Sequence, residues 1–164
     1  MNTVTENDRG LTIVRRLDAP REVVFRAWTD PEHLVWFANP LHPPRHPTTV
    51  DLRVGGAWRL HMVEHEDKSY TTGGIYREIV PPERLVFAWG AVGGWPDYDP
   101  GRPDEAPIVT VTLADLGDAT EMTFAVRFAG HVAQDVIEHW YSLGIKRGWV
   151  ETVDRIVPYL KETA

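Results

Sequence analysis

Residues 107–129 of the chain read PIVTVTLADLGDATEMTFAVRFA, and this stretch indicates how the protein folds. Apolar and polar side chains alternate on both sides of Gly117-Asp118. Alternation with a period of two is typical of a strand with one buried face, and a Gly-Asp pair between two such runs is typical of a tight turn. The stretch therefore predicts an antiparallel β-hairpin. Its expected buried face consists of Val109, Val111, Leu113, Met122, Phe124, Val126 and Phe128.

The same alternation recurs upstream and predicts an antiparallel meander. The further strands are expected at residues 10–18, 48–54, 57–65, 70–80 and 84–90. Downstream, residues 132–161 show apolar side chains at helical spacing and predict one long amphipathic helix. Because one sheet face must be buried against that helix, we expect an α+β fold, in which a curved seven-stranded antiparallel sheet wraps around the C-terminal helix.

Two short helices are expected after the first strand. Pro20 is placed to open one helix, and Asp30-Pro31 to end it and to begin the second. Residues 39–47, with four prolines and two histidines, and the glycine-rich residues 90–106 predict loops. We interpret residues 1–164 as one domain whose polar residues 1–9 are frayed.

Composition narrows the range of partners and compartments. Twenty-four acidic residues against seventeen basic ones give a net charge of −7, which argues against nucleic acids and anionic membranes as partners. The chain has no cysteine, so disulfides and thiolate chemistry are excluded. The N-terminus is polar and acidic, and no apolar run is long enough for a membrane helix. We therefore expect a cytoplasmic protein.

Four segments resemble, in order, the START/SRPBCC superfamily and, more narrowly, the activator-of-Hsp90-ATPase homologue-like proteins. They are RRLDAPREVVFRAWTDPEHLVWF (Arg15–Phe37), DLRVGGAWRL (Asp51–Leu60), GGIYREIVPPERLVFAW (Gly73–Trp89) and GWVETVDRIVPYL (Gly148–Leu160). The resemblance implies a START-like helix-grip fold with an apolar pocket between the sheet and the long helix. Superfamily members bind or transform hydrophobic small molecules. The eukaryotic co-chaperone carries a separate Hsp90-docking domain that this sequence does not show, so Hsp90 is not expected as a partner.

The expected site is an aromatic pocket that needs no metal and no organic cofactor. Its predicted ligand-binding residues are Trp58, Leu60, Met62, Tyr76, Glu78, Phe87, Trp89, Met122, Phe124, Trp140 and Gly144. Trp95 and Tyr98 in the glycine-rich loop are predicted to form a lid. Tyr76 and Glu78 share a strand parity, so an acid–base pair is one interpretation and an ion pair at the sheet edge is the other. Gly144 and Gly148 interrupt the long helix and are expected to allow close approach of another surface.

Three classes of function stay open. The leading one is a module that binds a hydrophobic or aromatic small molecule. The second is a cofactor-independent cyclase, hydratase or lyase that acts on a hydrophobic substrate in the same pocket. The third is a co-chaperone-like interaction protein, which would show an exposed apolar patch and no large cavity. A homodimer is also left open.

The histidines are expected to have structural or solvent-exposed roles. The segment from His61 to His65 matches the H-x-x-E-H pattern of zinc peptidases. On a strand, however, these two histidines stand ~13 Å apart, too far to share one zinc ion. We therefore expect His61 to lie on an exposed strand face, and His42 and His46 to be exposed loop residues.

Overall fold

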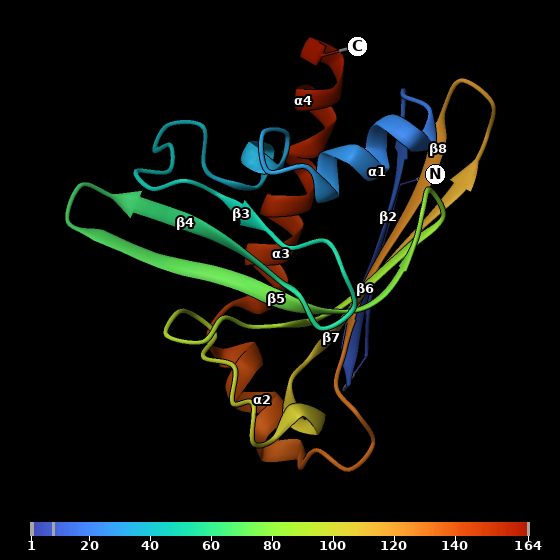
Figure 1. The fold of residues 1–164 in the computed structure, drawn as a ribbon. Helices are drawn as coiled ribbons and strands as arrows, with labels where there is room; N and C mark the ends of the chain where they lie inside the picture. Colours follow the sequence, from blue (N-terminus) through green and yellow to red (C-terminus); the bar gives the residue numbers. More distant parts are fainter. Residues whose placement is uncertain (1, 8, 164) are drawn as a thin grey trace.

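The computed structural model describes residues 2–7 and 9–163, in which eight strands form one antiparallel sheet in the order β1-β2-β8-β7-β6-β5-β4-β3. The sheet is strongly curved (Figure 1). The strands are β1 (Thr3–Asn7), β2 (Gly10–Leu17), β3 (Thr49–Val50), β4 (Ala57–His65), β5 (Lys68–Val80), β6 (Arg84–Trp89), β7 (Ile108–Asp115) and β8 (Thr120–Arg127). The predicted antiparallel meander and α+β class are confirmed.

The helices bury one face of this sheet, and the C-terminal ones run across it (Figure 1). They are α1 (Arg21–Thr29), the short 3₁₀ helices η1 (Leu34–Phe37) and η2 (Pro103–Glu105), and then α2 (Gln134–Ser142), α3 (Ile145–Asp154) and α4 (Ile156–Thr163). Within the described ranges, no helix is both long enough and apolar enough to cross a membrane.

The C-terminal helix is divided where a single helix over 132–161 was expected. Gly144 has a φ of +82°, in the left-handed region that glycine adopts without steric cost, and it ends α2 immediately before α3 begins. A second interruption falls at Arg155, between α3 and α4. The helical segment therefore changes direction beside the sheet.

The N-terminus departs from the expected fraying. Residues 3–7 form β1 and pair with β2 in an antiparallel register from Thr3 opposite Val14 to Asn7 opposite Gly10. This extra strand brings the sheet to eight. The prediction was wrong because strand pairing offers the polar segment backbone partners that its composition does not reveal. Residues 1 and 8 lie outside the described residues.

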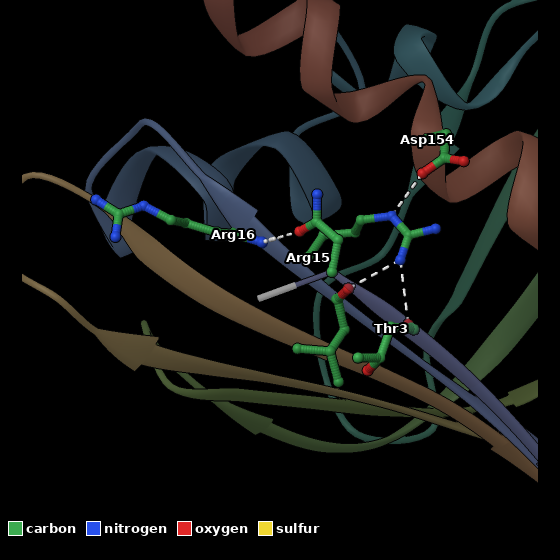
Figure 2. Close-up of polar contacts among 6 residues, drawn as sticks. Thr3, Arg15, Arg16 and Asp154 are labelled. Carbon is green, nitrogen blue, oxygen red and sulfur yellow. Dashed lines mark hydrogen bonds and ion pairs between the residues drawn. The ribbon is translucent and has the colours of Figure 1, made fainter.

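Arg15 occupies an inward-facing position of β2, on the same face as Leu11 and Ile13, and only 9% of its surface is exposed. Figure 2 shows how this charge is accommodated. Nε of Arg15 donates to Oδ1 of Asp154 on α3 at 2.7 Å, and Nη1 donates to the carbonyls of Thr3 and Val14 at 3.1 and 2.8 Å. The residue that interrupts the alternation of the first strand therefore joins β1 and β2 to the end of α3.

A β-bulge in β5 separates Tyr76 from Glu78. Tyr76 lies opposite Phe87 of β6, whereas Glu78 lies opposite Val86, so Arg77 is the extra residue. Because directly opposed residues share a face, the bulge moves Glu78 to the other face. The carboxylate of Glu78 is half-exposed and pairs with Arg84 at 3.2 Å. The interpretation of Tyr76 and Glu78 as an acid–base pair was therefore wrong, since parity counting cannot detect a bulge.

Candidate functional site

A cavity of about 460 Å³ lies between the β4–β5 region of the sheet and the C-terminal helices. The sheet side is formed by Met62, Glu64, Lys68, Ser69, Tyr70 and Thr72. The helical side is formed by Phe37 of η1, Leu143, Ile145, Gly148, Trp149 and Thr152. Gly144, Trp89 and Trp95 complete the lining. The wall is mostly apolar and carries a few hydroxyl groups, which is the usual composition of a small-molecule site.

Gly148 keeps the helical side of this cavity open. It lies within α3, and a Cβ built on it would meet no heavy atom within 4 Å beyond its immediate chain surroundings. The expectation that Gly144 and Gly148 allow close packing was therefore wrong, because both face open space. Gly144, Gly148 and Thr152 are four residues apart and so share one side of the helical segment. The missing side chains leave a groove along this side.

Indole rings build one wall of the cavity. The ring centroid of Trp89 lies 4.8 Å from that of Trp149 and 5.5 Å from that of Trp95. Trp140 packs behind Trp89 at 5.7 Å. Trp95 also meets the ring of Tyr70 at 5.6 Å, edge to face. These contacts favour a rigid aromatic surface, because edge-to-face pairs add stability beyond their buried area.

The cavity lining contains only part of the residue set predicted from the sequence. Met62, Trp89, Gly144 and the proposed lid residue Trp95 all line it. The inward-facing residues Trp58, Leu60, Tyr76, Phe87, Met122 and Phe124 are buried in the core and are absent from the lining. Trp140, Tyr98 and Glu78 do not line the cavity either. Which residues contact a ligand stays a prediction.

Several lining residues were not singled out from the sequence, and for some of them a signal existed. Tyr70 and Thr72 share the inward parity of Tyr76 but lie at the other end of β5, the end that borders the cavity. Trp149 lies on the apolar stripe of the C-terminal helical segment, in the part that forms α3. The sequence shows which face of a long strand is buried, but it does not show which end is left uncovered by a helix.

Charged side chains occur at two places around the cavity, one on the sheet side and one beside the helical side. Lys68 and Glu64 form an ion pair of 2.9 Å, and both side chains are about half-exposed. Beside the helical side of the cavity, the Arg155 guanidinium donates a hydrogen bond to the carbonyl of Phe37 at 2.7 Å. Burial raises the pKa of Tyr70, Glu64 raises it further, and Arg155 opposes both effects. The Tyr70 phenol therefore stays protonated at neutral pH and can donate a hydrogen bond into the cavity.

His61 lies under the proline-rich loop, where an exposed strand face was expected. Only 8% of its surface is exposed, its Nδ1 accepts the backbone N–H of Arg45 at 3.1 Å, and the ring of His46 lies 4.5 Å away. Burial lowers the pKa of His61, and the charges of His46 and Arg45 lower it further. The loop folds back onto β4 through this histidine, which accounts for the burial. In the part of the chain that the structure describes, no three metal-ligating side chains converge.

Comparison with known proteins identifies relatives of this architecture. The family model for Activator of Hsp90 ATPase homolog 1-like protein matches residues 18–161. No curated protein sequence matches the chain. Among solved structures, protein Ms6760 from Mycobacterium smegmatis superposes with a TM-score of 0.78 at 20% identity, over 99% of this chain and 98% of that one.

Two further solved structures show the same fold. Protein NE0264 from Nitrosomonas europaea superposes with a TM-score of 0.76 at 22% identity, over 97% of this chain and 98% of that one. A protein from Arthrobacter aurescens gives a TM-score of 0.76 at 23% identity, over 98% and 91% of the two chains. At such identities the likeness concerns the fold alone. The expected helix-grip architecture is thereby confirmed.

Proposed function

This chain belongs to the family of Activator of Hsp90 ATPase homolog 1-like proteins, and from that premise we propose that it binds a hydrophobic, aromatic small molecule between the β4–β5 region and α3. The observation that carries the proposal is the cavity of about 460 Å³ with a tryptophan wall. Its volume falls in the range of ~300–1,000 Å³ found for small-molecule sites. Apolar ligand surface that is buried there contributes roughly 25 cal/mol per Å² before the costs of association.

The groove along the helix supports the same proposal. Two glycines and a threonine face the cavity from the helical segment, and the Gly148 position is open for at least 4 Å. A helix that only needed to pack on the sheet would gain stability from a larger side chain at position 148, since glycine in a helix costs about 1 kcal/mol relative to alanine. The open space at Gly148 comes at a cost in helix stability, and a binding site would account for it, because a ligand needs that space.

The other two classes of function have less support. A co-chaperone-like interaction protein was expected to lack a large cavity, and a cavity is present. The enzymatic alternative would use pocket polar groups such as Tyr76, Glu78 or a loop histidine, and the bulge in β5 places Tyr76 and Glu78 on opposite faces of the sheet. A module that binds its ligand without transforming it therefore remains the preferred function.

The test uses the neutral fluorescent probe N-phenyl-1-naphthylamine and a variant that fills the cavity. Gly148→Phe places an aromatic ring in the open space, whereas Gly148→Ala adds only a methyl group. Arg147→Phe adds the same ring at the neighbouring position of α3, where the native side chain is 86% exposed. We expect the wild type, Gly148→Ala and Arg147→Phe to bind the probe, and Gly148→Phe to lose at least about tenfold in affinity. Equal binding by Gly148→Phe would overturn the proposal.

A further inference from the structure

We infer that the ligand of this cavity carries one anionic group, such as a carboxylate or a sulfonate, and that Arg155 binds it at the η1 end. The inference rests on the proposed function, because it concerns the same cavity. It adds the chemical class of the ligand: an aromatic acid.

The position of Arg155 follows from helical geometry. Gly148 and Thr152 line the cavity from one side of α3, and Arg155 continues that stripe three residues beyond Thr152. Its backbone N–H still bonds to the carbonyl of Thr152 at 3.1 Å. The guanidinium donates to the carbonyl of Phe37 at 2.7 Å, and Phe37 itself lines the cavity. The charged group is thereby held beside one end of the lined space.

The charge of Arg155 is not neutralised by an ion pair. Among the described residues, no carboxylate lies within 4.0 Å of its guanidinium, although the side chain is half-buried. Burial lowers the pKa of Arg155, and Glu151, one turn earlier on α3, opposes that effect. The carboxylate of Glu151 accepts a hydrogen bond from Arg147 at 2.8 Å. A guanidinium has five N–H donors in a planar fork, and the bond to Phe37 uses one nitrogen. The remaining donors suit two oxygens of one oxyanion, such as a carboxylate or a sulfonate.

Arg155 lies outside the cavity lining, and the two charged side chains within the lining balance each other. Lys68 and Glu64 pair with each other at 2.9 Å and cancel. Tyr70, which lines the cavity, feels the Arg155 guanidinium, since that charge lowers the pKa of the phenol against the opposing effect of burial. An anion between Tyr70 and Arg155 would accept one hydrogen bond from the neutral Tyr70 phenol and others from the charged Arg155 guanidinium.

A matched pair of probes tests this inference. 8-Anilinonaphthalene-1-sulfonate and N-phenyl-1-naphthylamine share the arylamine body and differ in the sulfonate. We expect the wild type to bind the sulfonate more tightly. Arg155→Met, which keeps an apolar stem, should lower the affinity for the sulfonate by about tenfold. It should change the affinity for the neutral probe by less than about twofold. The control Lys161→Met removes an exposed cation of α4 that lies outside the cavity lining, and it should leave the ratio of the two affinities unchanged.

The possible outcomes separate the two proposals. If Gly148→Phe blocks both probes but Arg155→Met leaves binding of the sulfonate unaffected, or if Lys161→Met has the larger effect, the inference is overturned and the proposed function stands. If neither probe binds, or if Gly148→Phe blocks neither, the proposed function fails first. Near-UV circular dichroism shows whether Arg155→Met is folded. If it is not folded, binding of the two probes is compared at low and high salt in the Lys161→Met variant. Added salt should weaken binding of the sulfonate only, and a ratio of affinities that does not depend on salt overturns the inference.

Discussion

The indole N–H of Trp89 donates to the hydroxyl of Thr72 on the neighbouring strand, over 3.2 Å. Both side chains are nearly inaccessible to solvent and both border the cavity. The hydrogen bond satisfies a polar atom that burial would otherwise leave without a partner. It also fixes the plane of the ring that stands at the centre of the tryptophan wall, so the wall is oriented before a ligand arrives.

Replacement of Thr72 by Val tests this bond. Valine has a similar shape but no acceptor, so the buried N–H of Trp89 loses its partner at a cost of about 1–3 kcal/mol. Urea unfolding should show that loss in Thr72→Val. Thr72→Ser, which keeps the hydroxyl, should lie closer to the wild type, and equal stabilities of the two variants would contradict the role of the bond.

Gly148→Ala should raise stability. The residue lies inside α3, its Cβ has open space, and alanine is favoured over glycine in a helix by about 1 kcal/mol. Thermal unfolding followed by circular dichroism should show a higher Tm. At Gly144, where φ is +82°, the same change to alanine should lower the Tm, because the left-handed backbone disfavours a Cβ. A Tm that falls in both variants would argue against the open space at Gly148.

Asp154→Ala should destabilise the protein more than Glu151→Ala. Asp154 pairs with Arg15, which is 9% exposed and cannot return to solvent without disturbing β2. Loss of a hydrogen bond to such a charged group costs roughly 1.5–3 kcal/mol. Glu151 pairs with Arg147 at the surface, where an ion pair contributes about 1 kcal/mol or less. Urea unfolding of both variants provides the comparison, and equal losses would show that Arg15 finds another partner.

Acid should destabilise the fold through His61. Burial, with His46 and Arg45, lowers the pKa of His61 below its ordinary value of 6.5. Between the folded pKa and 6.5 the unfolded chain binds more protons, so stability rises with pH across this window. The contribution is complete above pH 6.5 and is lost as the pH falls through the folded pKa.

Urea unfolding at several pH values checks this expectation. His61→Gln should flatten the dependence of stability on pH below 6.5. The control His131→Gln changes an exposed histidine and should keep the slope of the wild type. An unchanged slope in His61→Gln would show that another group is responsible.

The sequence was sufficient to predict the meander, the helix-grip arrangement and the presence of a cavity. Strand alternation and helical spacing report which side chains face inward, and that is enough to assign two layers. Most of the predicted pocket residues, such as Phe87 and Met122, do face inward, but they lie in the filled part of the core. Periodicity does not show where the sheet and the helix diverge.

Two errors in the predicted set of site residues have a common physical origin. Gly144 and Gly148 look alike in sequence, but one adopts a left-handed conformation that ends α2 and the other continues α3. Likewise, the parity of Glu78 is inverted by a bulge that depends on pairing with β6. In both places the backbone conformation depends on tertiary contacts, which the local sequence pattern does not show.

The tryptophan wall has an optical consequence. Trp89 has three indole neighbours with ring centroids between 4.8 and 5.7 Å away. At such separations the excited states of the rings mix, and the dichroism of their absorption bands depends on the angles between them. A molecule that bound beside Trp89 would change the surroundings of these rings and so would perturb their absorption bands. Near-UV circular dichroism of the unlabelled protein would therefore detect such binding.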